Sequence, residues 1–320
     1  AMTDPADTQP AAPRAATDAD PPAGPPGAGA DAPSRRAPDP AAAPPPRLGA
    51  LAPLARIGPL ARMLAAPARP RAPREARREI ALALLWGGVC HALFAAAVAA
   101  MVVSMAFGMS RAFGTVPQPW AWAANLGLLL QFPLVHSLLL SRRGRGALAR
   151  LAPAGTGPTL ATTTYAAVAS VQLLALFLLW TPSGVIWWRA EGPVLALVLG
   201  LYAASWALLG KASWDAGAEV QSGALGWVSL ARGAKPRFPP MPETGLFRVM
   251  RQPIYLGFAL TTWTVPVWTP DQLLLASVLT AYCALGPLAK ERRFEAMFGA
   301  RWRAYRARHG YWWPRLGSRP

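Results

Sequence analysis

The chain has 320 residues, of which 53% are hydrophobic and only 15% are charged, whereas a soluble domain carries about a quarter charged residues. The net charge of +17 does not indicate nucleic-acid binding, because the arginines border apolar segments and form no folded basic surface. The two cysteines, Cys90 and Cys283, lie inside apolar runs and offer neither a disulfide framework nor a zinc pattern, so no metal site is predicted.

The N-terminal part of the chain, residues 1–70, is predicted to be a disordered tail rich in Pro and Ala, followed by a membrane domain at 71–320. Residues 3–46 contain almost no large apolar side chain and cannot bury enough surface to offset chain entropy. Residues 48–64 place leucines near helical spacing, but Pro53 and Pro59 interrupt them. A membrane-surface segment and a flexible linker both remain open for that stretch.

Six apolar segments follow a basic run at 71–78, and they occupy residues 80–109, 120–140, 160–180, 193–212, 253–268 and 273–289. A helix needs about 20 apolar residues to cross a bilayer, so the fifth segment is short. Clusters of Lys and Arg stand before the first segment and after the second, fourth and sixth, which puts both termini in the cytoplasm.

The predicted fold is therefore an all-α polytopic membrane bundle of about six spans, with a C-terminal helical hairpin and a cytoplasmic tail helix. A bacterial inner membrane is the expected location. The lipid bilayer is the expected environment, and neither a nucleic-acid nor a protein partner is predicted.

A polar stretch at residues 245–257 enters the fifth segment. Arg248 and Arg251 precede Pro253, which suits the first turn of a helix. Cationic donors then lie at a helix N-terminus, where backbone amides and the helix dipole favour anions. Charge returns at Lys290 and Glu291, so a hairpin would bring both polar ends to one membrane surface.

The run Arg251-Gln252-Pro253-Ile254-Tyr255-Leu256-Gly257, followed by Glu291, Phe298-Gly299 and Tyr305, resembles the membrane methyltransferases of the isoprenylcysteine carboxyl methyltransferase type. Val135-His136-Ser137, Thr164-Tyr165 and the loop at 236–245 are similar to the nurim-like branch of that superfamily. That branch includes the bacterial methanethiol S-methyltransferases. The resemblance covers roughly residues 81–314.

The resemblance implies S-adenosylmethionine as the cofactor and a small thiol or a lipophilic molecule as the acceptor. It implies catalytic roles for Arg251 and Gln252, and substrate contacts for His136 and Tyr165. An arginine suits the cofactor's carboxylate, and aromatic rings can stack on adenine or face the sulfonium. The implied cofactor-binding residues are Arg248, Arg251, Gln252, Pro253, Tyr255, Gly257, Glu291, Trp302 and Tyr305.

The sequence departs from the family pattern at several positions. Gln252 replaces the signature His, Lys290 replaces the first Glu of a pair, and Trp302 replaces a Tyr. A glutamine can form hydrogen bonds but cannot shuttle a proton near neutral pH. Two alternatives to the methyltransferase therefore stay open: a non-catalytic protein of the nurim or nitric-oxide-response type, and a haem-bearing membrane isomerase with His91 or His136 as ligand.

Structural interpretations of the same residues also stay open. Arg248 and Arg251 could be a cytoplasmic basic flank, and Glu291 could be a solvated tail residue. Trp302 and Tyr305, interleaved with arginines, could belong to an aromatic belt at the membrane interface.

Overall fold

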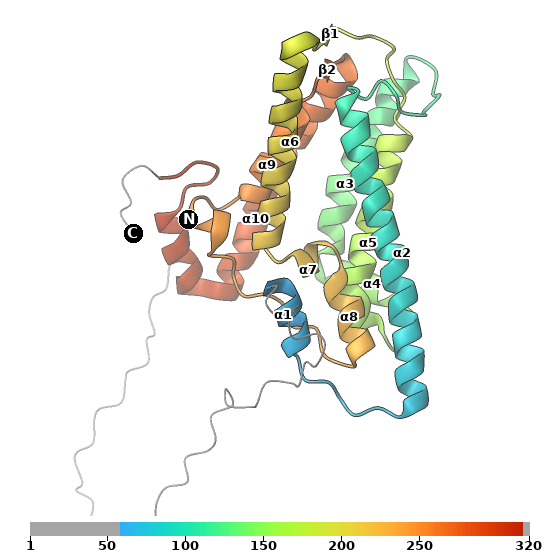
Figure 1. Ribbon diagram of the computed structural model, residues 1–320, viewed down its shortest axis with the longest axis vertical. Coiled ribbons are helices and arrows are strands. Elements are labelled where there is room, and N and C mark those ends of the chain that lie inside the picture. The colour runs from blue at the N-terminus through green and yellow to red at the C-terminus, as the bar shows by residue number, and fades with distance from the viewer. Residues whose placement is uncertain (1–57, 316–320) are drawn as a thin grey trace, which may run out of the picture. The chain divides into compact units, whose positions relative to one another are not determined.

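The computed structural model describes residues 58–315 of the chain. Five helices in this part are long and apolar enough to cross a membrane (Figure 1). They are α2 (Pro73–Ala106), α3 (Trp120–Leu139), α5 (Gly157–Leu178), α6 (Gly192–Asp215) and α10 (Pro270–Arg308). Large apolar side chains such as Leu84, Leu134 and Leu197 are exposed on these helices, as lipid contact requires. The predicted all-α polytopic membrane bundle is confirmed.

Shorter elements connect the long helices. Near one end of the bundle lie α1 (Gly58–Ala65), α4 (Arg142–Leu151), α7 (Ala218–Gln221), α8 (Ala224–Arg232) and the 3-10 turn η3 (Gly245–Arg248) (Figure 1). At the opposite end, β1 (Trp188–Arg189) pairs antiparallel with β2 (Val267–Trp268), with Trp188 opposite Trp268. The segments between the apolar runs, for which the sequence pattern predicts no helix, contain α4, α7 and α8.

The predicted fifth span, at 253–268, is helical over only part of its length. Helix α9 (Pro253–Trp263) ends after 11 residues, and the chain continues as an extended segment into β2. Pro266 explains the end of the helix, because proline lacks an N–H group and disfavours helical geometry in the preceding residue. The amide of Gln272 donates to the Thr262 carbonyl at 2.7 Å, and the backbone N–H of Ala190 donates to the Pro266 carbonyl at 2.8 Å. These bonds satisfy non-helical backbone groups that a membrane protein cannot leave unpaired in lipid.

Helix α10 joins the predicted sixth span, 273–289, to the predicted tail helix. Gly299, at φ 52° and ψ −121°, bends the helix beyond its apolar part. Glycine tolerates this positive φ because it has no Cβ. The charged part of the helix from Lys290 onward therefore lies outside the apolar span and leads into the C-terminal tail.

The bundle is built from two groups of helices. Helix α2 packs on α5 and α8, while α9 packs between α6 and α10. At the end that carries β1 and β2 the groups are joined by polar contacts around the buried Asp271, whose carboxylate accepts from Trp180 Nε1 and from the Ser183 backbone N–H, both at 2.9 Å. The buried core beside these contacts includes Trp180, Phe177 and Leu275.

The structure describes residues 58–70 of the stretch that was predicted to be a disordered tail. Helix α1 lies inside the predicted tail, and its Met63 and Leu64 are buried. Arg62 Nε donates to Glu219 Oε1 at 2.7 Å, and the Arg69 backbone N–H donates to the Gly233 carbonyl at 2.9 Å. Residues 58–70 therefore pack on the membrane domain, and the rest of the predicted tail, including residues 48–57, lies outside the described residues.

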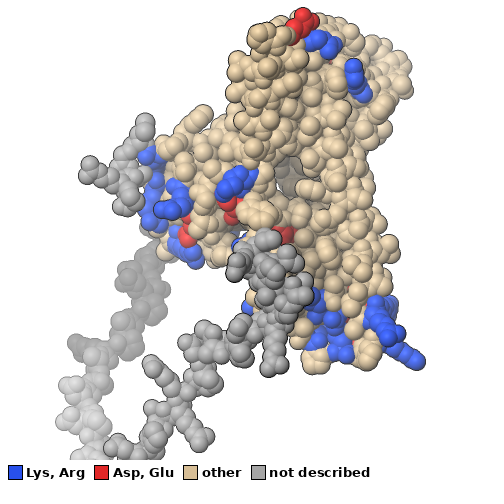
Figure 2. Space-filling view, viewed as in Figure 1, with Lys and Arg blue, Asp and Glu red and all other residues tan. Residues whose placement is uncertain are grey.

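The C-terminal part of α10 and α1 both lie toward the half of the bundle that holds α4, α7 and α8, away from β1 and β2 (Figure 1). Figure 2 shows Lys and Arg gathered near this end and around the C-terminal part, with few charges along the long helices.

Candidate functional site

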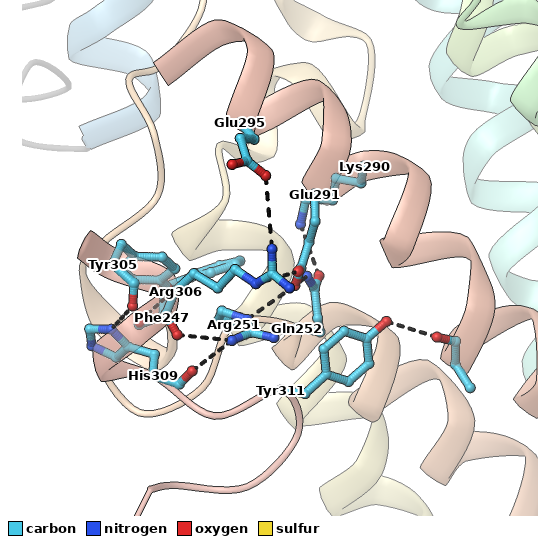
Figure 3. Close-up of polar contacts among 11 residues, drawn as sticks. Phe247, Arg251, Gln252, Lys290, Glu291, Glu295, Tyr305, Arg306, His309 and Tyr311 are labelled. Carbon is cyan, nitrogen blue, oxygen red and sulfur yellow. Dashed lines mark hydrogen bonds and ion pairs between the residues drawn. The ribbon is translucent and has the colours of Figure 1, made fainter. Parts of the chain in front are cut away.

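The structure brings the two polar ends of the hairpin together, as the sequence predicts. Arg251 lies directly before α9, and its Nε donates to Glu291 Oε1 at 3.0 Å (Figure 3). Their side chains are only 10% and 8% exposed, so the pair is neither a solvated flank nor a surface ion pair. Arg251 Nη1 also donates to the backbone carbonyls of Arg306 at 3.0 Å and His309 at 2.9 Å. Arg251 therefore fastens the C-terminal tail to the hairpin.

Two of the departures from the family pattern, Gln252 and Lys290, contact each other. Gln252 is fully buried and is the residue before the first turn of α9. Its Nε2 donates to Glu291 Oε1 at 2.8 Å, and its Oε1 accepts from Lys290 Nζ at 3.2 Å (Figure 3). The amide thus uses its donor and acceptor ends at once and joins Lys290 to the pair formed by Arg251 and Glu291.

Lys290 connects this polar network to aromatic surroundings. Its Nζ lies 5.7 Å from the ring centroids of Phe247 and Tyr255 and 5.3 Å from that of Phe294. Lys290 stands one residue beyond the apolar part of α10. Burial lowers its pKa to about 8, with Glu291 raising it and Arg293 lowering it further.

A cavity of about 480 Å³ lies between α2, α3, α5, α9 and α10, and Lys290 is one of the residues that line it. Most of its lining is apolar, including Phe94, Phe132 and Phe258. The polar side chains at its lining are His136, Arg145, Thr162, Tyr165, Ser170, Gln221, Tyr255, Tyr282, Lys290 and Arg293. A cavity of this size between helices, with a few convergent polar groups, is typical of a small-molecule site.

Two polar atoms at this cavity have no hydrogen-bond partner within residues 58–315. They are His136 Nδ1 and Thr162 Oγ1. The His136 ring lies between the rings of Phe132, at 5.0 Å, and Tyr165, at 4.8 Å. Buried polar atoms are normally paired, so these two mark positions where a ligand could supply the partner.

Six of the predicted site residues fall into two adjoining sets. Tyr255, His136 and Tyr165 line the cavity, whereas Arg251, Gln252 and Glu291 form the adjoining network.

The remaining predicted residues lie elsewhere. Trp302 and Tyr305 pack in a buried cluster with Met241, and the Tyr305 hydroxyl donates to the Phe247 carbonyl at 2.7 Å. The pair is buried in protein, so it does not form the interfacial belt that its spacing allowed. Arg248 is exposed.

Pro253 and Gly257 have structural roles within α9. Pro253 opens the helix, and Gly257 lies where an added Cβ would come within 3.0 Å of the Leu209 backbone on α6. Gly257 therefore allows α6 and α9 to approach closely.

Several cavity residues were not predicted from the sequence. Arg293 stands three residues after Lys290, a spacing that shares one side of a helix and could have identified it. Arg145 on α4 had been interpreted only as part of a basic flank, and Tyr282 lies within an apolar span. Neither carries a local signal, because the cavity is created by packing between distant helices.

Several curated proteins are similar to the chain. A methanethiol S-methyltransferase 1 of Bradyrhizobium diazoefficiens is 31% identical over 186 residues, which cover 58% of this chain and 64% of the relative. Methanethiol S-methyltransferase 2 of the same organism is 30% identical, with 61% and 74% covered. A methanethiol S-methyltransferase of Mycobacterium tuberculosis is 30% identical, with 58% and 75% covered.

The chain thus spans less than two thirds of the first of these relatives and about three quarters of the other two. No family model and no solved structure matches the chain. The second and third relatives are each 30% identical to the chain, which covers about three quarters of their length. The hairpin motif and the bundle of apolar helices point to the same family. The chain belongs to the methanethiol S-methyltransferase-like family of membrane methyltransferases.

Proposed function

We propose that this protein transfers a methyl group from S-adenosylmethionine to the sulfur of a small thiol. The reaction takes place in the cavity that Lys290 lines. The observation that carries the proposal is the meeting of the hairpin with α3 and α5 around one apolar cavity. Tyr255, Lys290 and Arg293 come from the hairpin, and His136 and Tyr165 come from the other two helices.

The residues at the cavity fit the methyl donor. The guanidinium groups of Arg145 and Arg293 suit its carboxylate, since arginine presents a fork of donors. The rings of Tyr165, Tyr255 and Tyr282 suit a cation or a planar base. The unpaired atoms of His136 and Thr162 add hydrogen-bonding capacity. When bound, the donor supplies a methyl group activated by a sulfonium charge.

The protein's own contribution is chiefly alignment and exclusion of water. Arg251, Gln252 and Glu291 hold α9, α10 and the tail in one arrangement, which fixes Tyr255 and Lys290 at the cavity. Correct alignment of reactants can supply about 7–11 kcal/mol of a barrier. In this role the buried network positions the site without touching the reacting atoms.

A short alkyl thiol is the acceptor that the lining supports best. Phe94, Phe132 and Phe258 offer apolar surface and no strong hydrogen-bonding specificity. The relatives are named for methanethiol, which is such an acceptor. The end of the bundle that holds the network is the basic one, which suits a cytoplasmic site in a bacterial inner membrane.

Detergent-purified protein mixed with S-adenosylmethionine labelled in its methyl group and with methanethiol tests the proposal. We expect labelled dimethyl sulfide and saturable binding of the donor. Replacing both Arg145 and Arg293 by Met should weaken donor binding at least tenfold, about 1.4 kcal/mol. The matched control replaces the exposed neighbours Arg248 and Arg292 by Met and should bind normally. A folded, monodisperse preparation that binds no donor would favour the non-catalytic alternative.

A further inference from the structure

Lys290 differs from every other cation at the cavity. Among the described residues that line it, Lys290 is the one amine, and the remaining cations are the guanidinium groups of Arg145 and Arg293. An arginine stays protonated in proteins, whereas a lysine shifts its pKa readily when it is buried. Of these three cations, only the amine can therefore exchange a proton with a bound molecule under ordinary conditions.

The surroundings of Lys290 leave its nitrogen able to accept a proton. One hydrogen bond holds it, the 3.2 Å contact with Gln252 Oε1, and the rings of Phe247, Tyr255 and Phe294 surround it. A neutral amine can keep donating to Gln252 while its lone pair points elsewhere. The same contact fixes the nitrogen next to the cavity that the amine lines.

The charges that face Lys290 oppose one another. Glu291 on the same helix favours the ammonium form, and Arg293, one turn later, disfavours it. Gln252 and Tyr255 on α9 are neutral partners, and Arg145 adds a second positive charge to the cavity lining. His136, Tyr165, Tyr282 and Cys283 complete the titratable groups among the described residues that line this cavity. Burial together with the arginines favours the neutral amine.

We propose that Lys290 is the general base that accepts the thiol proton during methyl transfer. This inference rests on the proposed function and adds a catalytic residue to it. The S–H proton moves to the neutral Nζ, which becomes an ammonium group. The sulfur's electron pair forms the new bond to the methyl carbon, and the pair of the breaking sulfonium C–S bond stays on the departing thioether. Loss of the proton to water later restores the amine.

His136 is the other base at the cavity, and ordinary proton affinities favour Lys290 over it. A free thiol of the cysteine kind has a pKa of about 8.5, imidazole about 6.5 and the lysine amine about 10.4. Transfer from such a thiol to imidazole is therefore uphill by about two pKa units, whereas transfer to a lysine amine whose pKa burial lowers to about 8 is uphill by only about half a unit. Burial lowers the pKa of Lys290 to about 8, so part of the amine is neutral near pH 7. This pKa is also close to the pKa of about 8.5 of the thiol, as efficient general-base catalysis requires.

Acceptors of different acidity test the proposal. Ethanethiol needs a base at pH 7, whereas 4-nitrothiophenol is already a thiolate. In Lys290→Met and Lys290→Arg, we expect transfer to ethanethiol to fall about 100-fold or more, the usual contribution of a general base. Transfer to 4-nitrothiophenol and binding of S-adenosylmethionine should stay within threefold of the wild type. His136→Gln should lose less than tenfold with ethanethiol.

A measurement without methyl donor gives an independent readout. The rate of acetylation of Lys290 as a function of pH, followed by mass spectrometry, reports its neutral fraction. We expect half of the maximal rate near pH 8 for Lys290, well below the pKa of about 10.4 of an ordinary lysine amine. The exposed Lys235, acetylated in the same sample, serves as the internal control.

Two outcomes would overturn the role of Lys290. One is undiminished ethanethiol methylation in a folded Lys290→Met variant that still binds the donor, and the other is an acetylation profile equal to that of Lys235. If the wild type methylates neither acceptor, the proposed function fails, and the role of Lys290 fails with it. If the wild type is active and only the Lys290 tests fail, the methyltransferase stands without this base.

Discussion

Arg251 is the residue on which the C-terminal tail depends. Its guanidinium binds Glu291 and two tail carbonyls in surroundings that leave the side chain 10% exposed. Removing one partner of a buried ion pair costs about 3–5 kcal/mol, because the other charge stays buried without its partner. We expect Arg251→Ala to lower the unfolding temperature clearly and to make the chain after residue 299 sensitive to protease.

Arg248 provides the control for this prediction. It lies three residues earlier on the 3-10 turn and is exposed. Arg248→Ala should change the free energy of unfolding by no more than about 0.5 kcal/mol. Equal unfolding temperatures for the two variants would show that the buried pair adds little to stability.

At this scale the sequence predicts contacts that follow from local geometry. A hairpin must return its ends to one surface, so the meeting of Arg251 and Glu291 could be predicted. The hydrogen bonds from Arg251 to the carbonyls of Arg306 and His309 could not be predicted, because the positions of these carbonyls depend on the bend at Gly299. The cavity could not be predicted either, because its lining combines residues that are far apart in the chain.

At the scale of an element, helix α1 could not be predicted from the local sequence either. Its sequence contains two prolines in or near a weak leucine pattern, which does not distinguish a helix from a linker. What fixes the helix lies about 150 residues away, where Glu219 is fully buried and accepts from Arg62. Helix α9 is the opposite case, since its early end could have been inferred from Pro266 alone.

Truncation tests whether α1 belongs to the domain. A chain that starts at Gly58 should purify and unfold like the full-length protein. A chain that starts at Arg71 lacks Arg62 and leaves the Glu219 carboxylate buried without its ion pair, so we expect it to be less stable by about 3–5 kcal/mol.

Glu219→Gln separates loss of charge pairing from loss of the helix. In the chain that starts at Arg71, this substitution should recover part of the lost stability, because a neutral amide is less costly to bury than a charge. If the chains starting at Gly58 and Arg71 unfold at the same temperature, α1 does not stabilise the membrane domain. The domain then starts at residue 71, as the sequence predicts.

At the scale of the whole molecule, the number of passes and the distribution of charge fix a testable topology. Five helices are long and apolar enough to cross the membrane, and we propose that the shorter α9 with its extended segment makes a sixth crossing. The loop before β1 therefore lies at the end opposite α4, α8 and the tail. The basic end should be cytoplasmic, because Lys and Arg gather on that side of membrane proteins.

Single cysteines can report this orientation. Val185 lies in the loop before β1 and is 47% exposed, and Met297 lies on the charged part of α10 and is 69% exposed. The native Cys90 and Cys283 are buried, so they should contribute little background labelling. In intact spheroplasts, a membrane-impermeant maleimide should label Val185→Cys at once and Met297→Cys only after permeabilisation. The reverse pattern would place the cavity's polar end outside the cell, and equal labelling of both sites would contradict the three crossings, by α6, α9 and α10, between residues 185 and 297.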